Sequence, residues 1–178
     1  MRRAKCLRSN SKRPAFDFVL HAGSSLVTAP RRPVSVLVIV YTDDGDVLML
    51  QRRAPFEFWQ SVTGTLDPGE LPQDAARREL AEETGLSSEG QLMDRKISRI
   101  FTIDPRWRDR YAEGVTENEE HEWHYRLPGP SEIRIDNDEH GDFRWMTVDE
   151  AIDAVWSWTN RDALVKLKSE LRWPNGKR

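Results

Sequence analysis

Three glutamates stand close together in a segment of helical composition: Glu79, Glu82 and Glu83, at spacing i, i+3 and i+4. At 100° per residue these positions fall within one sector of a helix, so the three carboxylates share a face. Like charges so close repel one another unless a cation lies among them. Hard oxygen ligands of this kind suit Mg²⁺, or Mn²⁺ in its place. All three glutamates are therefore candidate metal ligands and catalytic residues.

A solvated acidic face is the ordinary alternative, in which Glu79 and Glu83 would only pair with Arg77 and Arg78. The neighbouring sequence argues against it, because it fills every position of the pattern G-x5-E-x7-R-E-U-x-E-E-x-G-U, where U is a bulky aliphatic residue. The matching residues are Gly64, Glu70, Arg78, Glu79, Leu80, Glu82, Glu83, Gly85 and Leu86. From average residue frequencies, a chance match at a given start is on the order of one in a billion.

This segment resembles the Nudix box, the signature of a family of pyrophosphohydrolases. The resemblance implies the Nudix fold, an α/β/α sandwich, and hydrolysis of a pyrophosphate bond with a divalent metal ion. It implies that Glu79 and Glu83 are the principal metal ligands, with Glu82 as a further or water-mediated ligand. Arg78 is counted with the catalytic residues, and its pairing with Glu70 would hold the turn between loop and helix.

The chemistry of such a site follows from the metal. It would neutralise phosphate charge, orient the attack and lower the pKa of a bound water so that hydroxide is available near neutral pH. Gly64 and Gly69 are interpreted as backbone devices that let the loop fold sharply over the start of the helix.

Five strings outside the box narrow the resemblance: 31–35, 47–53, 58–64, 110–116 and 157–161. Together they resemble the branch of the family that acts on dihydroneopterin triphosphate in folate biosynthesis. The implied reaction converts 7,8-dihydroneopterin triphosphate and water into the monophosphate and pyrophosphate. Deoxynucleoside triphosphates such as dATP would be secondary substrates.

The resemblance implies a set of substrate contacts in these strings and in the strand segment 101–104: Arg31, Arg52, Thr63, Phe101, Thr102, Ile103, Asp104 and Ser157. Arg31 and Arg52 make physical sense as partners of a polyphosphate, although a surface ion pair is the alternative for each. Trp59 and Trp158 could stack on a pterin ring. A tryptophan is more often packed in a core, so both stay outside the predicted site.

A fourth acid comes from the polar stretch 136–142. Glu139-His140 matches a Glu-His pair that relatives carry shortly before a strand ending in tryptophan. Glu139 is therefore a candidate metal ligand, a general base for the attacking water, or both, with a solvated acidic loop as the alternative. A short insertion after Pro128 leaves the register of the neighbouring acids open. Weaker candidates for the base, assigned to an acidic loop, are Glu117, Glu119 and Glu120.

The elements that must position these residues can be placed from pattern. Strands are expected at 34–41, 47–51, 58–66, 96–103, 122–127 and 143–146, and helices at 72–84, from the capping box at 147–150, and from Asn160 to about Leu171. A tight turn at 43–45 should join the first two strands, and the first strand should be buried on both faces. The irregular alternation favours an α/β (α+β) domain, a mixed β-sheet sandwiched between helices.

Length and composition set the remaining limits. A chain of 178 residues suits one domain, expected at 31–173, after a basic disordered arm at 1–30 and before a short tail at 174–178. The net charge of −3 argues against binding of duplex nucleic acid, and no apolar run approaches the roughly 20 residues of a membrane helix. A single cysteine excludes an internal disulfide and favours the cytoplasm. The expected assembly is a monomer or a homodimer.

Two rival functions stay open. One is a broader nucleotide-pool or dinucleoside polyphosphate hydrolase, since fold and box do not fix the leaving moiety. The other is a Nudix-fold nucleotide-binding regulator without catalysis, which would be expected to lose box carboxylates. None is missing in this sequence. The histidines show no helix-spaced ligand pair, so zinc is not expected.

Overall fold

The computed structural model describes residues 30–171, so nearly all of the predicted basic arm and the whole predicted tail lie outside the described residues. The elements in chain order are β1 (Val34–Thr42), β2 (Asp46–Arg52), β3 (Phe58–Gln60), β4 (Val62–Thr65), α1 (Pro72–Thr84), β5 (Gln91–Thr102), the 3₁₀ helix η1 (Pro105–Arg110), β6 (Glu117–Leu127), β7 (His140–Thr147), α2 (Val148–Ala154) and α3 (Trp158–Glu170). No helix in this part of the chain is long and apolar enough to cross a membrane.

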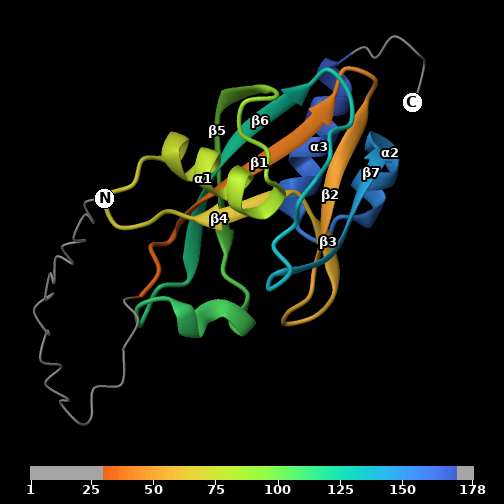
Figure 1. Cartoon of the computed structure of the whole chain (residues 1–178). Helices are drawn as coiled ribbons and strands as arrows, with labels where there is room; N and C mark the ends of the chain where they lie inside the picture. Colours follow the sequence, from red (N-terminus) through yellow and green to blue (C-terminus); the bar gives the residue numbers. More distant parts are fainter. Residues whose placement is uncertain (1–29, 172–178) are drawn as a thin grey trace, which may run out of the picture.

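The strands form one mixed sheet in the order β3-β2-β1-β6-β5, with β4 paired to β1 and β7 paired to β2. β1 runs parallel to β6 and antiparallel to β2 and β4. The sheet therefore splits between β1 and β2, because β4 pairs with β1 whereas β7 pairs with β2. Helix α1 lies on one face, and α2 with α3 lies on the other, as Figure 1 shows. This arrangement confirms the predicted sandwich.

β1 is buried on both faces, as predicted. Val36, Val38 and Val40 belong to the core cluster that includes α1 residues, whereas Leu37 and Ile39 belong to the cluster on the α2–α3 side. The period of two along a strand sends alternate side chains to opposite faces, so an unbroken aliphatic run is what a central strand requires.

Helix α1 begins and ends where the sequence indicated. Pro72 occupies its first turn, and Gly85 ends it in the left-handed conformation at φ 75°. Ala76, Leu80 and Thr84 are buried against the sheet, which leaves the glutamates on the neighbouring stripe. The capping box that opens α2 is also confirmed, since the Thr147 and Glu150 side chains each bond the other's backbone.

Three predicted elements differ in the structure. The strand expected at 58–66 is two strands, β3 and β4, which pair with β2 and β1 respectively. The strand expected at 96–103 starts at Gln91 and continues through a bulge, with Lys96 at φ 56°. The strand expected at 122–127 starts at Glu117, so the acids assigned to a loop lie in β6 beside β1. Pairing with a long neighbouring strand overrides the weak β-propensity of glutamate.

Asn160 does not cap the last helix, contrary to the prediction. Ser157 is the cap, and its hydroxyl accepts from the Asn160 amide. The Asn160 side chain instead binds the junction of β3 and β4, where its Oδ1 accepts from the Ser61 N–H at 2.8 Å and its Nδ2 donates to the Ser61 hydroxyl at 3.0 Å. Both groups are buried, so the amide is fully used within the fold.

Candidate active site

The box glutamates occupy three different environments. Glu83 is 3% exposed, and its Oε2 accepts from the Thr63 N–H at 3.3 Å. Glu79 is half-buried, whereas the Glu82 side chain is 58% exposed. The three carboxylates therefore do not form one solvated acidic face, because Glu82 alone is well exposed. Burial holds the pKa of Glu83 above its ordinary value, although the neighbouring His140 opposes this shift.

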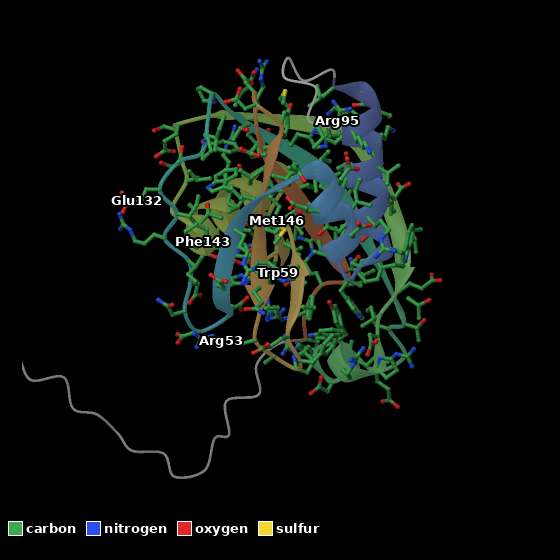
Figure 2. The ribbon with its side chains drawn as sticks, turned by 90° about the vertical axis from the view of Figure 1, so that its right-hand side faces the viewer. Arg53, Trp59, Arg95, Glu132, Phe143 and Met146 are labelled. Atoms are coloured by element: carbon green, nitrogen blue, oxygen red, sulfur yellow. The ribbon has the colours of Figure 1, made fainter. Side chains whose placement is uncertain are left out.

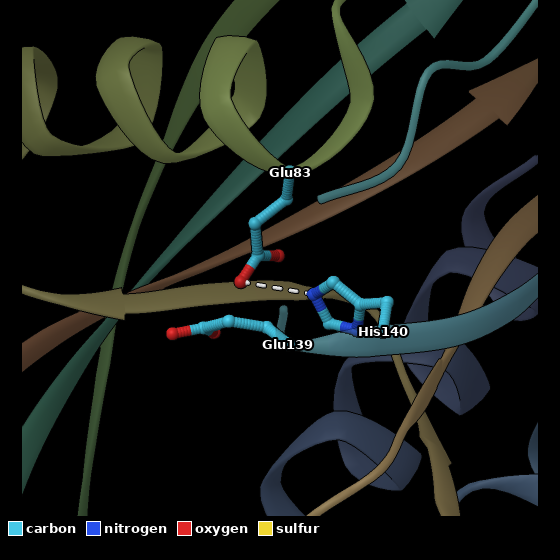
Figure 3. A group of neighbouring side chains, drawn as sticks. All are labelled: Glu83, Glu139 and His140. Atoms are coloured by element: carbon cyan, nitrogen blue, oxygen red, sulfur yellow. Dashed lines mark ion pairs between the residues drawn. The ribbon is translucent and has the colours of Figure 1, made fainter. Parts of the chain in front are cut away.

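Glu83 meets residues from the other side of the divided sheet. One ligand atom each from Glu83, Glu139 and His140 lies within 4.8 Å of the other two. Figure 3 shows Glu83 reaching from α1 toward His140, at the start of β7, with Glu139 alongside. His140 Nε2 is 3.3 Å from Glu83 Oε1. The structure thus brings together two predicted metal ligands and adds His140, which forms no helix-spaced ligand pair in the sequence. The feature of the sequence that could have identified His140 as a ligand is its position directly after Glu139.

This group fits a cation. Glu83 Oε1 and both ring nitrogens of His140 are buried and make no hydrogen bond within residues 30–171, although Glu83 Oε1 and His140 Nε2 face each other as an ion pair at 3.3 Å. Buried polar atoms normally have hydrogen bonds, so ligand atoms that meet at one point without them indicate a site that a bound ion completes. Glu139 is currently tied to Arg52, whose Nη1 lies 2.6 Å from its Oε2. The pair is only partly buried, so either partner can be exchanged, Arg52 for a metal or Glu139 for a phosphate.

Glu79 depends on a glycine. A Cβ on Gly64 would lie 1.8 Å from the Glu79 carboxyl carbon, so any larger residue there would displace the carboxylate. Gly64 lies within β4 and makes room for Glu79, whereas Gly69, at φ 80°, is the turn glycine. The prediction of a sharp turn holds for Gly69 only. Burial raises the pKa of Glu79 to about 7, against the opposing effect of Arg78.

The predicted pair of Arg78 and Glu70 is confirmed. Arg78 donates to both carboxylate oxygens of Glu70 at 2.9 Å and to the Thr65 carbonyl at 3.1 Å. This bidentate pair ties helix α1 to the loop before it and holds the pKa of Glu70 below its usual range. Arg78 also donates to Glu79 at 2.7 Å, so it positions a second carboxylate at the mouth of the site.

A cleft of about 780 Å³ runs from the box across the α3 side of the molecule. Each of the predicted substrate contacts lines it: Arg31, Arg52, Thr63, Phe101, Thr102, Ile103, Asp104 and Ser157. The cleft also takes in Arg78, Glu79, Glu82 and Glu139. Residues predicted separately as catalytic and substrate-binding therefore share one cavity.

Several of these side chains already have partners. The Asp104 carboxylate accepts from the Arg106 backbone and guanidinium, and this pairing lowers the pKa of Asp104 to about 2. The Ser157 hydroxyl caps α3 and lies 2.7 Å from the Thr159 hydroxyl. Both residues line the cleft, but their polar atoms also stabilise its walls.

An aromatic wall was missed by sequence reasoning. Phe56, Phe58, Trp107 and Trp156 form one cluster, with ring centroids 4.9 to 6.3 Å apart. All but Phe56 line the cleft, as does the exposed Trp158. Three separate segments of the chain supply these rings, so no local sequence pattern predicts the cluster.

The two tryptophans considered from sequence have different roles. Trp59 does not line the cleft and packs beside Met146 against the α2–α3 core, in the region labelled in Figure 2. The Arg144 guanidinium lies 5.0 Å from its ring centroid. Core packing is thus the correct interpretation for Trp59, whereas Trp158 is 58% exposed at the rim of the cleft.

Of the three weaker base candidates, Glu120 alone lines the cleft. It is 7% exposed, and burial raises its pKa to about 7. Glu117 is exposed, and Glu119 points to the other side of β6 with a side chain 45% exposed.

The family model described as NUDIX domain matches residues 31–167. The chain is 41% identical over 138 residues to the dihydroneopterin triphosphate diphosphatase of Escherichia coli (strain K12), covering 75% of this chain and 91% of that protein. It is 41% identical over 142 residues to the Haemophilus influenzae protein of the same name, covering 78% and 89%.

A solved structure agrees with these relatives. The structure of the E. coli dihydroneopterin triphosphate pyrophosphohydrolase aligns with a TM-score of 0.75 and 37% identity. The alignment covers 81% of this chain and all of that one.

Proposed function

The chain belongs to the Nudix family, and on that premise we propose that it is a metal-dependent pyrophosphohydrolase whose substrate is 7,8-dihydroneopterin triphosphate. The products would be the monophosphate and pyrophosphate, a step of folate biosynthesis. One observation carries the proposal: a single cleft joins the carboxylates of Glu79, Glu82 and Glu139 to every position that the family resemblance assigned to the substrate, while Glu83 lies buried beside it. The high identity to two dihydroneopterin triphosphate diphosphatases supports the same substrate.

The two ends of the cleft suit the two parts of such a substrate. Glu79, Glu82 and Glu139 line the end where the triphosphate would meet a divalent cation, which neutralises phosphate charge and lowers the pKa of water when bound. Arg31 and Arg52 line the same cavity and can bind phosphate oxygens. The aromatic wall offers flat surfaces for a ring.

We assign the metal to Glu83 and Glu139 first, with Glu79 and Glu82 beside them. The unpartnered atoms of Glu83 and His140 favour this set, and carboxylate oxygens suit Mg²⁺ or Mn²⁺. Arg52 would then exchange Glu139 for a substrate phosphate. This exchange frees the Glu139 carboxylate for the metal or for the attacking water.

A substrate panel tests the proposal. Purified protein with Mg²⁺ is given dihydroneopterin triphosphate, the four deoxynucleoside triphosphates including dATP, and dinucleoside polyphosphates, and kcat/KM is compared. We expect the highest kcat/KM for dihydroneopterin triphosphate, with pyrophosphate released and a smaller rate on some deoxynucleotides. A higher value for a dinucleoside polyphosphate would identify the broader hydrolase instead. Tight nucleotide binding without turnover of any substrate would identify a regulator.

A further inference from the structure

Three buried side chains at the floor of the cleft have polar atoms without partners. They are Gln60 Nε2, Asn118 Oδ1 and Glu120 Oε1, none of which has a hydrogen-bond partner among the described residues. All three residues line the cleft, and each is at least nine-tenths buried, at 8%, 1% and 7% exposure respectively. Leaving such atoms unpaired costs free energy, so a floor built this way indicates that a ligand completes it.

The fold holds these atoms in place. Asn118 and Glu120 are two residues apart on β6 and therefore point to the same face of the sheet. The Asn118 Nδ2 donates to the Ser35 hydroxyl at 2.7 Å on the neighbouring β1, which turns its oxygen outward. Gln60 ends β3 beside the Ser61–Asn160 contact. The donor and the two acceptors are thus set on rigid strands.

A short relay fixes Glu120. The Thr159 hydroxyl bonds the Glu120 carboxylate, and the Ser157 hydroxyl lies 2.7 Å from that of Thr159. If Thr159 donates to the carboxylate, its own oxygen accepts from Ser157. Ser157, inferred from sequence as a substrate contact, is on this account a positioning residue for Glu120. One carboxylate oxygen is held by the relay and the other is left for a ligand.

We propose that Gln60, Asn118 and Glu120 form a subsite for the polar edge of a 2-amino-4-oxopyrimidine ring. That edge presents an amino group, a ring N–H and a carbonyl, which are two donors and one acceptor. The floor offers the complement, two acceptors and one donor. The pterin of dihydroneopterin and the base guanine share this edge. Adenine does not, because it pairs an amino donor with a ring acceptor.

This subsite deepens the proposed function and partly rests on it, because it explains why a pterin triphosphate would be preferred. It also revises one expectation from sequence, since dGTP should be a better secondary substrate than dATP. A site built around hydrogen bonds to a polar edge rejects an analogue that leaves its buried groups unpaired.

The test uses Glu120→Gln, with Glu119→Gln as the matched control on the opposite side of β6. An amide oxygen lacks the charge of the carboxylate, and its NH₂ opposes ring donors. We expect KM for dihydroneopterin triphosphate and dGTP to rise about 10- to 100-fold, the scale of hydrogen bonds to charged groups, while dATP changes little. Values of kcat should fall far less. The control should match wild type.

Other results would overturn the proposal. If Glu120→Gln lowers kcat equally for every substrate and leaves KM unchanged, Glu120 acts in the chemistry, as a base would. If the preference for dGTP over dATP survives in Glu120→Gln, residues other than Glu120 recognise the polar edge of the ring.

Binding of rings without phosphate separates this inference from the proposed function. Calorimetric titration with neopterin, guanosine and adenosine should show weak binding of the first two by wild type, lost in Glu120→Gln. Neopterin binding without hydrolysis of the triphosphate would refute the proposed function and keep the subsite. Hydrolysis of the triphosphate together with equal binding of guanosine and adenosine would refute the subsite and keep the proposed function.

Discussion

The two ends of the cleft are built in different ways. At the box end, helix α1 and the loop before it supply the box carboxylates and the Arg78–Glu70 pair that holds them, and Glu139 joins them from the segment before β7. At the recognition end, the aromatic wall and the polar floor are assembled from strands, η1 and the start of α3. The box itself is one short segment of sequence, whereas Glu139 and the residues of the recognition end come from distant segments that the fold brings together. Chemistry and specificity can therefore be changed separately, and the following predictions test that separation.

The largest effect is expected at the box end, from Glu83→Gln. A neutral amide loses the attraction to the metal but keeps nearly the same volume in the buried site. We expect kcat/KM to fall by on the order of 10³ for every substrate, with unchanged circular dichroism. Near-wild-type turnover by the folded variant at limiting Mg²⁺ would refute the assignment of Glu83 as a ligand.

Glu139→Gln should also act at the box end, and metal titration separates its two possible roles. We expect kcat to fall about 10²- to 10⁴-fold, with a smaller change in substrate affinity. If Glu139 is mainly a ligand, raising Mg²⁺ or substituting Mn²⁺ should restore much of the rate. A lost base stays lost at any metal concentration, and the acidic limb of the pH profile of kcat/KM disappears with it.

A smaller and more selective effect is expected at the recognition end. Trp158→Ala removes an exposed ring from the rim of the cleft, so folding should be unaffected. Loss of a stacking contact is expected to raise KM about 2- to 10-fold with kcat retained. Trp59→Ala, in the core, should instead lower the melting temperature. A fall in kcat with unchanged KM for Trp158→Ala would show that the recognition end also affects the chemical step, and would contradict the separation of the two ends.

The smallest effect is on stability and concerns Glu120. Burial raises its pKa to about 7 from the ordinary 4.5, with Arg99 and Thr159 opposing the shift and Glu122 adding to it. Because the folded pKa is raised, this residue's contribution to stability is full below pH 4.5 and is lost as pH rises to about 7. The loss is at most about 3 kcal/mol.

Glu120→Gln should remove this pH dependence. We expect its melting temperature, relative to wild type, to be several degrees higher at pH 8 than at pH 4.5, at about 2–4 °C per kcal/mol. Glu119→Gln serves as the exposed control and should show no such change. An identical difference at both pH values would mean that the Glu120 carboxylate is not desolvated. A variant that is more stable but less selective is what a binding subsite predicts.

What the sequence predicted follows the same division. The box, α1 and the Arg78–Glu70 pair were predictable because their spacing is local, whereas Phe101 and Asp104, which line the cleft, were singled out only through the family resemblance. The polar floor was not predicted, because Gln60 and Glu120 meet only after β3 and β6 join one sheet. The same reason explains Asn160, whose position in sequence suited a cap but whose partner is Ser61.

The contact between Asn160 and Ser61 has a consequence for how the molecule opens. Because both hydrogen bonds are buried and join the start of α3 to the β3–β4 junction, the Ser61 N–H can reach water only when α3 leaves the sheet. Its hydrogen exchange should therefore be slow and should report the detachment of α3 as a unit. A ligand that bridges the floor and the box would slow that exchange further. The exchange rate of the Ser61 N–H would therefore measure opening of the cleft without an activity assay.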